Sequence, residues 1–500
     1  MVWSKLTGSM NGENHNTLEL DTHTLADLEL FGSAESGGLF EYCDYCKTDG
    51  GRIALKRRMM SPWANPVKIR ATQESIAYIS RHREIFEALP SAYLASHVDR
   101  YLGAGMPIVR AKNSLEFGMD AFHLWANYDN YYIKIIHGVG LSQRLLLAIR
   151  EMLEYPDAHS VSGELASLFG EMRSLMNSAE LTRVMQAPPA KRFWQKLRLD
   201  QCLRLYEKTK LIRLLAICYE LDALVSLSDV THKHGLVMPV IETGPTAISA
   251  RELVHPLLKH PVGNPLALDQ AGRVLFLTGP NMAGKTTYLR AILTALYFAH
   301  LGMGVPAKTF SFVPVQSLLT SISLSDNLVE GISFFRAEAL RVKAVAEALA
   351  EGGRIVAIMD EPFKGTNVKD ALDASFEVIR QFAAKQDSLF VISSHLIELE
   401  ESLDAVAHID YAYFEAQEHG AELAFDYRVR KGVSDQRLGM RVLHEEGVFD
   451  LLIADSAPLM ARGGRKSRRR NPMRRRLLLR LRSGRLSRPV NAANLMAVWV

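Results

Sequence analysis

Residues 274–296, VLFLTGPNMAGKTTYLRAILTAL, decide the fold predicted for this chain. The first five residues, VLFLT, have the length and composition of a buried strand. The loop GPNMAGKT follows at residues 279–286, and a helical pattern begins directly behind it. A strand, a loop of this spacing and a helix form the context of a P-loop, whose backbone amides close around phosphate groups. A chance match in a glycine-containing turn is the alternative.

Within this loop, two side chains are expected to contact the phosphates and their metal ion. Lys285 would reach the β- and γ-phosphates of a nucleotide, and the Thr286 hydroxyl would complete a Mg²⁺ shell. The helix N-terminus adds a favourable potential for anions. The predicted nucleotide-binding residues are Gly279, Pro280, Asn281, Met282, Ala283, Gly284, Lys285, Thr286 and Thr287.

A pair of carboxylates follows a second apolar run, IVAIMDEP, which starts at residue 355. Asp360 would hold Mg²⁺ and Glu361 would polarise the attacking water. Alone, such a pair at a strand end is more often a solvated turn. Combined with the P-loop, it predicts a site of nucleotide hydrolysis.

A third apolar run, SLFVISSH, ends at His395. Its imidazole could contact the γ-phosphate or orient the water. A histidine whose hydrogen bonds are simply satisfied at a strand end is the alternative. The three strand ends together favour a catalytic role.

Length and composition limit the remaining possibilities. With 500 residues, 48% hydrophobic and 23% charged, the chain is expected to be globular, with about two to four domains, and neither disordered nor fibrous. No apolar stretch reaches the roughly 18 residues of a membrane span, and the N-terminus lacks a secretory pattern. Four cysteines cannot form a disulfide framework at this length, which predicts a cytoplasmic location.

The charge is unevenly distributed along the chain. Residues 462–488 contain 13 of the 59 Lys and Arg residues, and no acidic residue follows Asp455. The other 46 basic residues face 55 acidic ones, so the rest of the chain has a net charge of −9. The Arg-rich segment could bind phosphate backbones without sequence preference, or could be a solvated extension.

The periodicity of the apolar residues changes near residue 235. Before it, spacings of three and four predict a mostly helical region, and residues 193–227 are predicted to form one long helix. After it, short apolar runs at 274–278, 355–359 and 389–393 alternate with helical stretches. This alternation predicts a mainly parallel sheet covered on both faces.

Several segments together resemble the MutS family of DNA mismatch-repair ATPases. The quoted matches are TGPNMAGKTTYLR (278–290), ISFFRAE (332–338), DEPFKGTN (360–367), SSHLIELE (393–400) and FDYRVRKGVSDQRLGMRVL (425–443). Softer matches, such as TLADLELFG (24–32), ELDALVSLSDV (220–230) and ELVHPLL (252–258), extend the resemblance over residues 25–454.

The resemblance implies further site residues that spacing alone would not identify. Ser333, which alone reads as a helix N-cap, would touch the γ-phosphate bound by a partner subunit. Gly365, Thr366 and Asn367 would lie at the dimer junction. An aromatic residue and an asparagine flank the adenine in the family, and Asn264 is the candidate for the latter.

The sequence also departs from the family pattern. The lever-like segment begins within about thirty residues of Met1, so the mismatch-reading and connector domains are expected to be absent. Residues 91–190 show no β-rich clamp pattern, and Pro362, Phe363 and Lys364 replace the usual residues after the acidic pair. Direct mismatch reading by the family's own mechanism is therefore not expected.

Cys43 and Cys46 have the C-x-x-C spacing of metal or redox sites. A zinc site needs a second pair, and Cys202 and Cys218 are too far apart along the predicted helix to supply one. We therefore interpret these cysteines as buried or incidental thiols.

The sequence thus predicts a multidomain α and α/β protein. Its predicted parts are a disordered N-terminus (1–20), a helical lever domain (21–235), an ABC-type P-loop ATPase domain (236–455) and an Arg-rich disordered tail (456–500). The resemblance implies a homodimeric clamp that hydrolyses ATP with Mg²⁺ while bound to duplex, mismatched or branched DNA. Repair proteins are possible partners, and no membrane is involved. The alternative is a nucleotide-driven switch that acts on a protein partner without recognising DNA.

Overall fold

The structure, a computed structural model, describes residues 16–32, 37–187, 192–280, 282–323, 334–396, 398–419, 422–434 and 447–448. Two compact units divide the chain, Met1–Leu438 and Gly439–Val500. The first unit contains all the helices and strands considered below, and the Arg-rich segment 456–500 lies outside the described residues.

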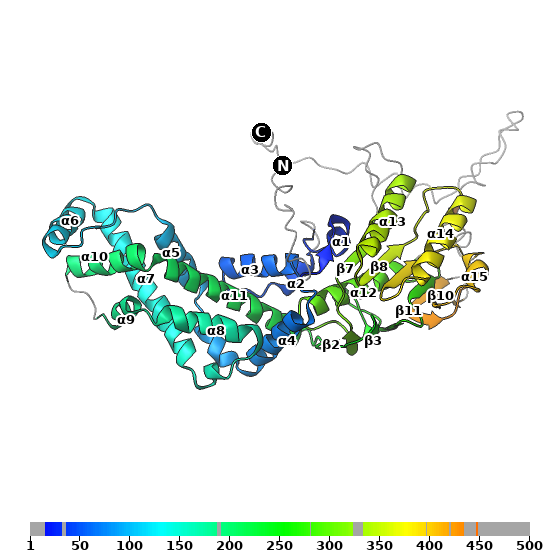
Figure 1. The fold of residues 1–500 in the computed structure, drawn as a ribbon, viewed down its shortest axis with the longest axis horizontal. Coiled ribbons are helices and arrows are strands. Elements are labelled where there is room, and N and C mark those ends of the chain that lie inside the picture. The colour runs from blue at the N-terminus through cyan, green and yellow to red at the C-terminus, as the bar shows by residue number, and fades with distance from the viewer. Residues whose placement is uncertain are drawn as a thin grey trace, which may run out of the picture. The chain divides into compact units, whose positions relative to one another are not determined.

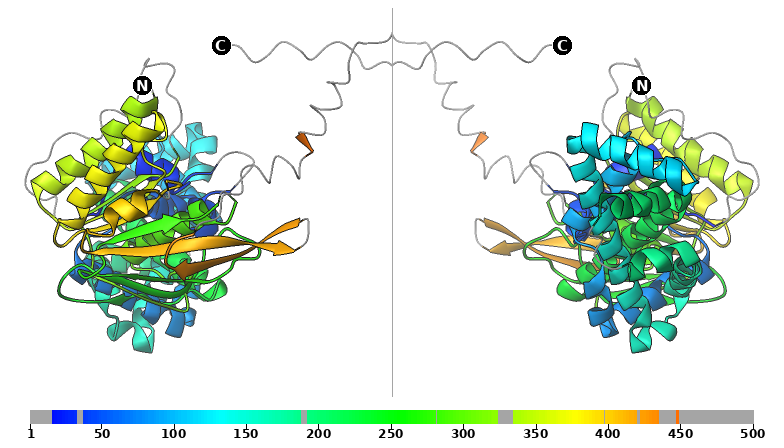
Figure 2. Two further views of the ribbon diagram at one scale, coloured as in Figure 1. Left: turned by 90° about the vertical axis from the view of Figure 1, so that its right-hand side faces the viewer. Right: turned by 90° about the vertical axis from the view of Figure 1, so that its left-hand side faces the viewer.

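A seven-stranded sheet organises the second half of this unit (Figure 1). Its order is β1-β7-β8-β9-β5-β10-β11, and every neighbouring pair is parallel except β10 with β11. The strands are β1 (Glu19–Leu20), β5 (Val274–Thr278), β7 (Ser317–Ser321), β8 (Ile355–Asp360), β9 (Leu389–Ser393), β10 (Ile409–His419) and β11 (Glu422–Lys431). The antiparallel β10–β11 pair is the long orange hairpin of Figure 2.

Both faces of this sheet are buried, as its continuous apolar strands require. In β5, Leu275 and Leu277 face the core that contains helix α12 (Lys285–His300). Val274 and Phe276 face the opposite core, which contains residues of α13, α14 and α15. These three helices span Phe334–Glu351, Val368–Ala383 and Glu398–Leu403. The predicted α/β architecture with a mainly parallel sheet is confirmed.

A second sheet of four strands, in the order β2-β6-β3-β4, packs in the same core as α12. Its strands are β2 (Val240–Ile241), β3 (Ile248–Leu253), β4 (Asn264–Leu268) and β6 (Thr309–Phe312). Since β4 also contacts β11, the two sheets meet beside the nucleotide loop that follows β5.

The start of the described chain belongs to the large sheet. β1 pairs with β7, and α1 (Thr22–Asp27) follows with Asp21 as its N-cap. The buried Asp27 carboxylate accepts hydrogen bonds from Thr320 Oγ1 and from the amides of Ile322 and Ser323 at the end of β7. The predicted disordered segment 1–20 is therefore too long, because residues 19 and 20 pair with β7.

From residue 37 to residue 234 the described structure is mostly helical, as predicted. The helices are α2 (Leu39–Cys43), α3 (Asp49–Met60), α4 (Pro66–Arg81), α5 (Ala92–Gly103), α6 (Ser114–Asn127), α7 (Asp129–Glu154), α8 (Gly163–Met176), α9 (Ala179–Gln186), α10 (Phe193–Gln201) and α11 (Lys208–Lys233), with short 3-10 turns at Arg83–Ala88 and Pro156–His159. No strand occurs among the described residues between 91 and 190, in agreement with the absence of a clamp pattern there.

The single long helix predicted over residues 193–227 is wrong. A π-helical turn, Cys202–Tyr206, separates α10 from α11. Asp200 and Arg204 form an ion pair there whose side chains are each 1% exposed. Arg204 also donates to the carbonyls of Met106 and Pro107, so the turn holds the segment after α5. Apolar spacing carries no information about these contacts.

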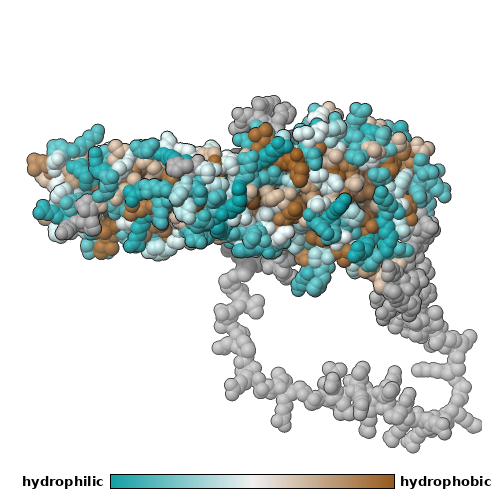
Figure 3. Space-filling view, turned by 90° about the horizontal axis from the view of Figure 1, so that it is seen from below, coloured by the Kyte–Doolittle hydropathy of each residue, from teal (hydrophilic) through white to brown (hydrophobic). Residues whose placement is uncertain are grey.

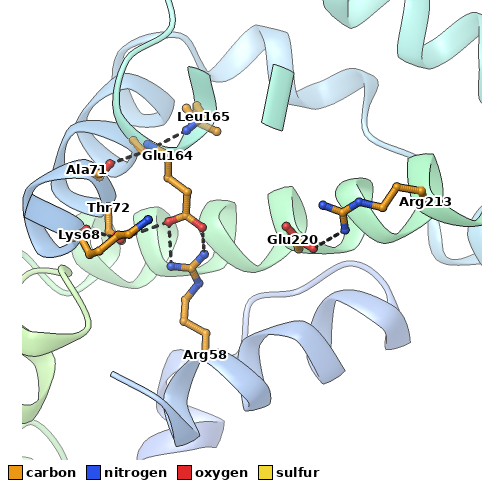
Figure 4. Close-up of polar contacts among 9 residues, drawn as sticks. Arg58, Lys68, Ala71, Thr72, Glu164, Leu165, Arg213 and Glu220 are labelled. Atoms are coloured by element: carbon orange, nitrogen blue, oxygen red, sulfur yellow. Dashed lines mark hydrogen bonds and ion pairs between the residues drawn. The ribbon is translucent and has the colours of Figure 1, made fainter. Parts of the chain in front are cut away.

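Glu164 joins three helices of this region (Figure 4). Its carboxylate, at the start of α8, pairs with Arg58 of α3 and accepts a hydrogen bond from Thr72 Oγ1 of α4. The amide of Glu164 donates to Ser75 Oγ, also on α4. These contacts fix the relative positions of α3, α4 and α8.

Two further hydrogen bonds attach this helical region to α12. Tyr297 Oη donates to Met59 O over 2.6 Å, and His300 Nδ1 lies 2.6 Å from Trp63 O.

Hydrophilic residues cover much of the face drawn in Figure 3, with apolar residues scattered between them. Among the helices that the structure describes, none is long and apolar enough to cross a bilayer.

Candidate nucleotide-hydrolysis site

The loop between β5 and α12 has the backbone of a phosphate-binding turn. Gly279 has φ 130°, and an added Cβ would lie 2.5 Å from Phe414 O. Gly284 has φ 104° and is the residue before α12. Only glycine adopts these conformations without strain, so both positions depend on its missing side chain. Asn281, also predicted here, lies outside the described residues.

Lys285, the first residue of α12, is 4% exposed. Its Nζ donates to Gly279 O over 2.6 Å and to Pro280 O over 3.3 Å, and lies 3.5 Å from His395 Nδ1. Burial lowers the pKa of Lys285, while the nearby Glu361 and Asp360 carboxylates oppose that shift. The N-terminus of α12 favours negative charge. A phosphate bound here would therefore meet both the helix N-terminus and the Lys285 ammonium.

Thr286 and Asp360 meet although 74 positions separate them in the sequence. Thr286 Oγ1 donates to Asp360 Oδ2 over 2.6 Å. The other carboxylate oxygen of Asp360 accepts a hydrogen bond from Ser393 Oγ. A hydroxyl and a carboxylate are hard oxygen ligands of the kind Mg²⁺ prefers, so these residues fit a magnesium site.

Glu361 and His395 form a second contact between strand ends. Glu361 Oε1 lies 2.5 Å from His395 Nε2. Burial raises the pKa of the Glu361 carboxyl, but the hydrogen bond and charge of His395, with the charge of Lys285, outweigh it and lower the pKa. The carboxylate therefore stays ionised at neutral pH, as a base for water requires.

Adjacent strand ends bring these groups together. β9 lies between β5 and β8 in the sheet, so the loop after β5, the acidic pair at the end of β8 and His395 after β9 meet at one edge. Ligands of open parallel sheets bind at this carboxyl edge. Glu361 has φ 51° and its amide donates to Ser393 O and Oγ, which anchors the turn to β9.

A pocket of about 450 Å³ adjoins the phosphate loop. It is lined by Leu253, Val254, His255, Leu258, His260, Val262, Asn264, Pro280, Met282, Gly284, Lys285, Thr286, Thr287, Tyr288, Ala291 and Tyr427. Its apolar and aromatic walls suit a flat base. Burial and the charge of Arg290 lower the pKa of His255 to about 4, so its ring is neutral at pH 7.

Asn264, the candidate that the resemblance implies for flanking the adenine, lines this pocket and is also bonded to β11. Its Nδ2 donates to Tyr427 O over 2.9 Å, and its Oδ1 accepts from Val429 N over 2.8 Å. The side chain is therefore bonded to the backbone of β11, and it holds Tyr427 at the pocket. Tyr427, 47% exposed, is one of the aromatic side chains that line the pocket.

The predicted dimer-junction residues follow the acidic pair. The Gly365 amide donates to Glu338, and Asn367 is the N-cap of α14, accepting from Asp370 N. Thr366 lies in the turn between them. Ser333 lies outside the described residues, immediately before α13.

Sequence reasoning missed Ser393 and Glu338, and it did not identify Tyr427 or His255 as pocket residues. Ser393 stands two positions before His395, so its place at the end of a predicted strand was a usable signal. The sequence contains no such signal for Tyr427, because 163 positions separate it from Asn264 and the contact between β4 and β11 brings the two residues together.

The thiols are isolated from this site. Cys43 is fully buried and Cys46 partly buried. Burial raises the pKa of both thiols, and it raises that of Cys218 to about 12. Among the described residues, the one cluster with the spacing of metal ligands is His82, Glu84 and Asp157, and it contains no cysteine.

A P-loop, an acidic pair and a histidine at three neighbouring strand ends define the class of P-loop ATPase domains of the ABC type. Residues 275–461 match the family model described as MutS domain V, which is the ATPase domain of that family. This part of the chain is therefore similar to the ATPase domain of MutS proteins.

Proposed function

We propose that this chain binds and hydrolyses ATP, and that the nucleotide state controls its binding to DNA in mismatch repair or recombination. The observation that carries the proposal is the meeting of Lys285, Thr286–Asp360 and Glu361–His395 at one sheet edge. Lys285 lies beside His395, Thr286 is bonded to Asp360, and Glu361 is in contact with His395. The side chains proposed to bind phosphate, hold Mg²⁺ and activate water are therefore neighbours.

In this proposal the loop residues 279–287 bind the triphosphate, and the pocket bounded by His255 and Tyr427 takes the adenine. The phosphates replace the carbonyls of Gly279 and Pro280 as acceptors for Lys285 Nζ. Thr286 and Asp360 hold Mg²⁺, which neutralises phosphate charge when bound.

Glu361 is the proposed catalytic base. It orients a water molecule toward the γ-phosphorus and takes its proton as the bond to the β–γ bridging oxygen breaks, leaving ADP and phosphate. His395 contacts both Glu361 and Lys285, so its imidazole can align the base and contact the γ-phosphate. Ser393 orients Asp360 and the backbone of Glu361.

The finer parts of the proposal come from the resemblance. Ser333 would complete the partner's nucleotide site, which requires a homodimer with Gly365, Thr366 and Asn367 at its junction. The helical residues 21–235 would act as the lever that closes around DNA, and residues 236–455 as the ATPase domain.

DNA binding is tested by fluorescence anisotropy of labelled homoduplex, single-mismatch duplex and four-way junction, with the full chain at one salt concentration. Any affinity that the Arg-rich segment adds is independent of sequence and common to all three DNAs, so the ratios of the Kd values report structure-specific binding. We expect one of the two altered DNAs to bind at least about tenfold more tightly. Equal Kd values for all three would contradict structure-specific recognition.

A nucleotide switch acting on a protein partner is the second candidate. The net charge of −9 outside residues 462–488 favours it, since DNA-binding surfaces are usually basic. ATP hydrolysis without measurable binding to any of the three DNAs would select this candidate.

A further inference from the structure

Beyond the residues already discussed, Glu338 is a buried carboxylate without an assigned role. It lies in the first turns of α13, five positions after Ser333, and is 2% exposed. Oε1 accepts a hydrogen bond from Lys364 N and Oε2 accepts one from Gly365 N, each over 3.1 Å. Both oxygens thus bind adjacent amides of the turn that follows Glu361.

This turn has an unusual backbone conformation. Glu361 has φ 51° and Phe363 has φ 67°, in the left-handed region that non-glycine residues rarely adopt. Such conformations persist only where surrounding contacts determine them. The contacts here are Ser393 on one side, which accepts from Glu361 N, and Glu338 on the other.

A ring contact supports the same connection between α13 and the turn. Phe363 is 4% exposed, and its ring centroid lies 6.0 Å from that of Phe335, on the first turn of α13. α13 therefore contacts the turn through one apolar side chain and one carboxylate.

The helix α13 is also fixed one turn further along the same face. Arg341, one turn after Glu338, donates to Thr320 O and pairs with Asp21, the N-cap of α1. Glu338 thus projects from a helix that is anchored to β7 and α1. A carboxylate on an anchored helix can hold a neighbouring turn in one conformation.

We propose that Glu338 is a positioning residue for ATP hydrolysis, which holds the turn after β8 so that the Glu361 carboxylate meets its water. The inference rests on the proposed function. It adds a residue that touches neither nucleotide nor metal but sets the geometry of the catalytic base. Because α13 begins directly after Ser333, the same carboxylate links the expected partner-contacting segment to the base.

Glu338→Gln tests this, because the amide keeps the size of the side chain but has one oxygen in place of two. Its NH₂ group would face a backbone N–H that no longer has an acceptor. We expect kcat for ATP hydrolysis to fall at least tenfold, with KM and the Kd of a fluorescent ATP analogue within about twofold of wild type. Glu347→Gln, on the exposed side of the same helix, is the matched control and should keep wild-type kcat.

A double-mutant comparison separates positioning from general structural support. If Glu338 acts through Glu361, single-turnover hydrolysis by Glu338→Gln/Glu361→Gln should equal that of Glu361→Gln alone. If Glu338→Gln lowered the rate of Glu361→Gln by the same factor as it lowers the wild-type rate, the proposal would be overturned. A rise in the KM of Glu338→Gln that matches its fall in kcat would overturn it too. Wild-type kcat in a folded Glu338→Gln variant would also overturn it.

Should Glu338→Gln not fold, Glu338→Asp carries the test, since it keeps the charge but shortens the reach. A lowered kcat at unchanged KM is expected, and wild-type kcat would contradict the proposal. An inactive wild-type chain would instead refute the proposed function itself, so the two failures are distinguishable.

Discussion

In the proposed mechanism, Glu361 is the side chain on which ATP hydrolysis depends most directly. Its carboxylate is ionised and lies against His395, and its backbone amide donates to Ser393 Oγ. Glu361→Gln removes the base but preserves the shape of the site. We expect kcat to fall about 100- to 10,000-fold while ATP binding changes less than about twofold. Phosphate release and fluorescent-nucleotide titration measure the two quantities.

The control for this substitution is Asp373→Asn, an exposed position on α14. It should leave kcat unchanged. A Glu361→Gln variant that hydrolyses ATP at the wild-type rate would exclude Glu361 as the base and direct attention to His395.

His300 makes the stability of the protein depend on pH. It is fully buried, its Nδ1 lies 2.6 Å from Trp63 O, and its Nε2 accepts from Val315 N over 3.4 Å. A neutral ring protonated on Nδ1 satisfies both contacts. Burial lowers the pKa of His300 to about 4, against 6.5 for an unperturbed histidine. The unfolded chain therefore binds this proton first as the pH falls.

Because the pKa is depressed in the folded state, the contribution of His300 is complete above pH 6.5 and is lost between pH 6.5 and 4. Between pH 7 and 5 the loss is about 2 kcal/mol of unfolding free energy. Urea denaturation at both pH values measures it. In His300→Gln, which cannot titrate, the difference between the two pH values should be smaller by about that amount. An unchanged difference would show that another group is responsible.

Much of the site, though not its environment, is predictable at the residue scale. Lys285, Thr286, Asp360, Glu361 and His395 follow from motifs at strand ends, and the structure brings them together. The hydrogen-bond partners that hold them do not follow, because they depend on side-chain directions across distant segments. Asn264 shows this: its position was predicted, but its amide is bonded to β11.

Among the secondary-structure elements, the π-helical turn Cys202–Tyr206 gives a clear stability prediction. Asp200 pairs with Arg204 inside the helical region, away from solvent. Asp200→Ala would leave the guanidinium buried without its counter-ion, which costs about 3–5 kcal/mol. Urea denaturation followed by circular dichroism measures this loss.

An exposed ion pair supplies the comparison for that variant. Lys343 and Glu347 on α13 are 65% and 62% exposed, so Lys343→Ala should have little effect on stability. Equal losses in the two variants would contradict a special contribution from the buried pair.

Strands are more predictable than helix continuity in this chain. The apolar runs 274–278 and 389–393 coincide with β5 and β9, since strands buried on both faces carry uninterrupted apolar residues. The break between α10 and α11 is set by Arg204, which binds carbonyls 98 and 97 positions away, and periodicity does not record such contacts. β1 was missed because two residues are too few for a pattern.

At the scale of the whole molecule, the Arg-rich segment predicts how DNA binding depends on salt. A variant ending at Asp455 lacks its 13 basic residues. If the segment binds DNA, the slope of log K against log salt should decrease by about 0.9 for each phosphate that the segment neutralises. The ratio of mismatch to homoduplex affinity should stay unchanged. A lower ratio in the shortened variant would place structure-specific recognition in the segment itself.

The central claim is that the site at the ends of β5, β8 and β9 hydrolyses ATP. Steady-state phosphate release from MgATP by the full chain, beside Lys285→Ala, tests it most directly. We predict saturable release by the wild type and a loss of at least about 100-fold in the variant, whose loop lacks the ammonium for the β- and γ-phosphates. Equal release by both proteins, or none by the wild type, would contradict the claim.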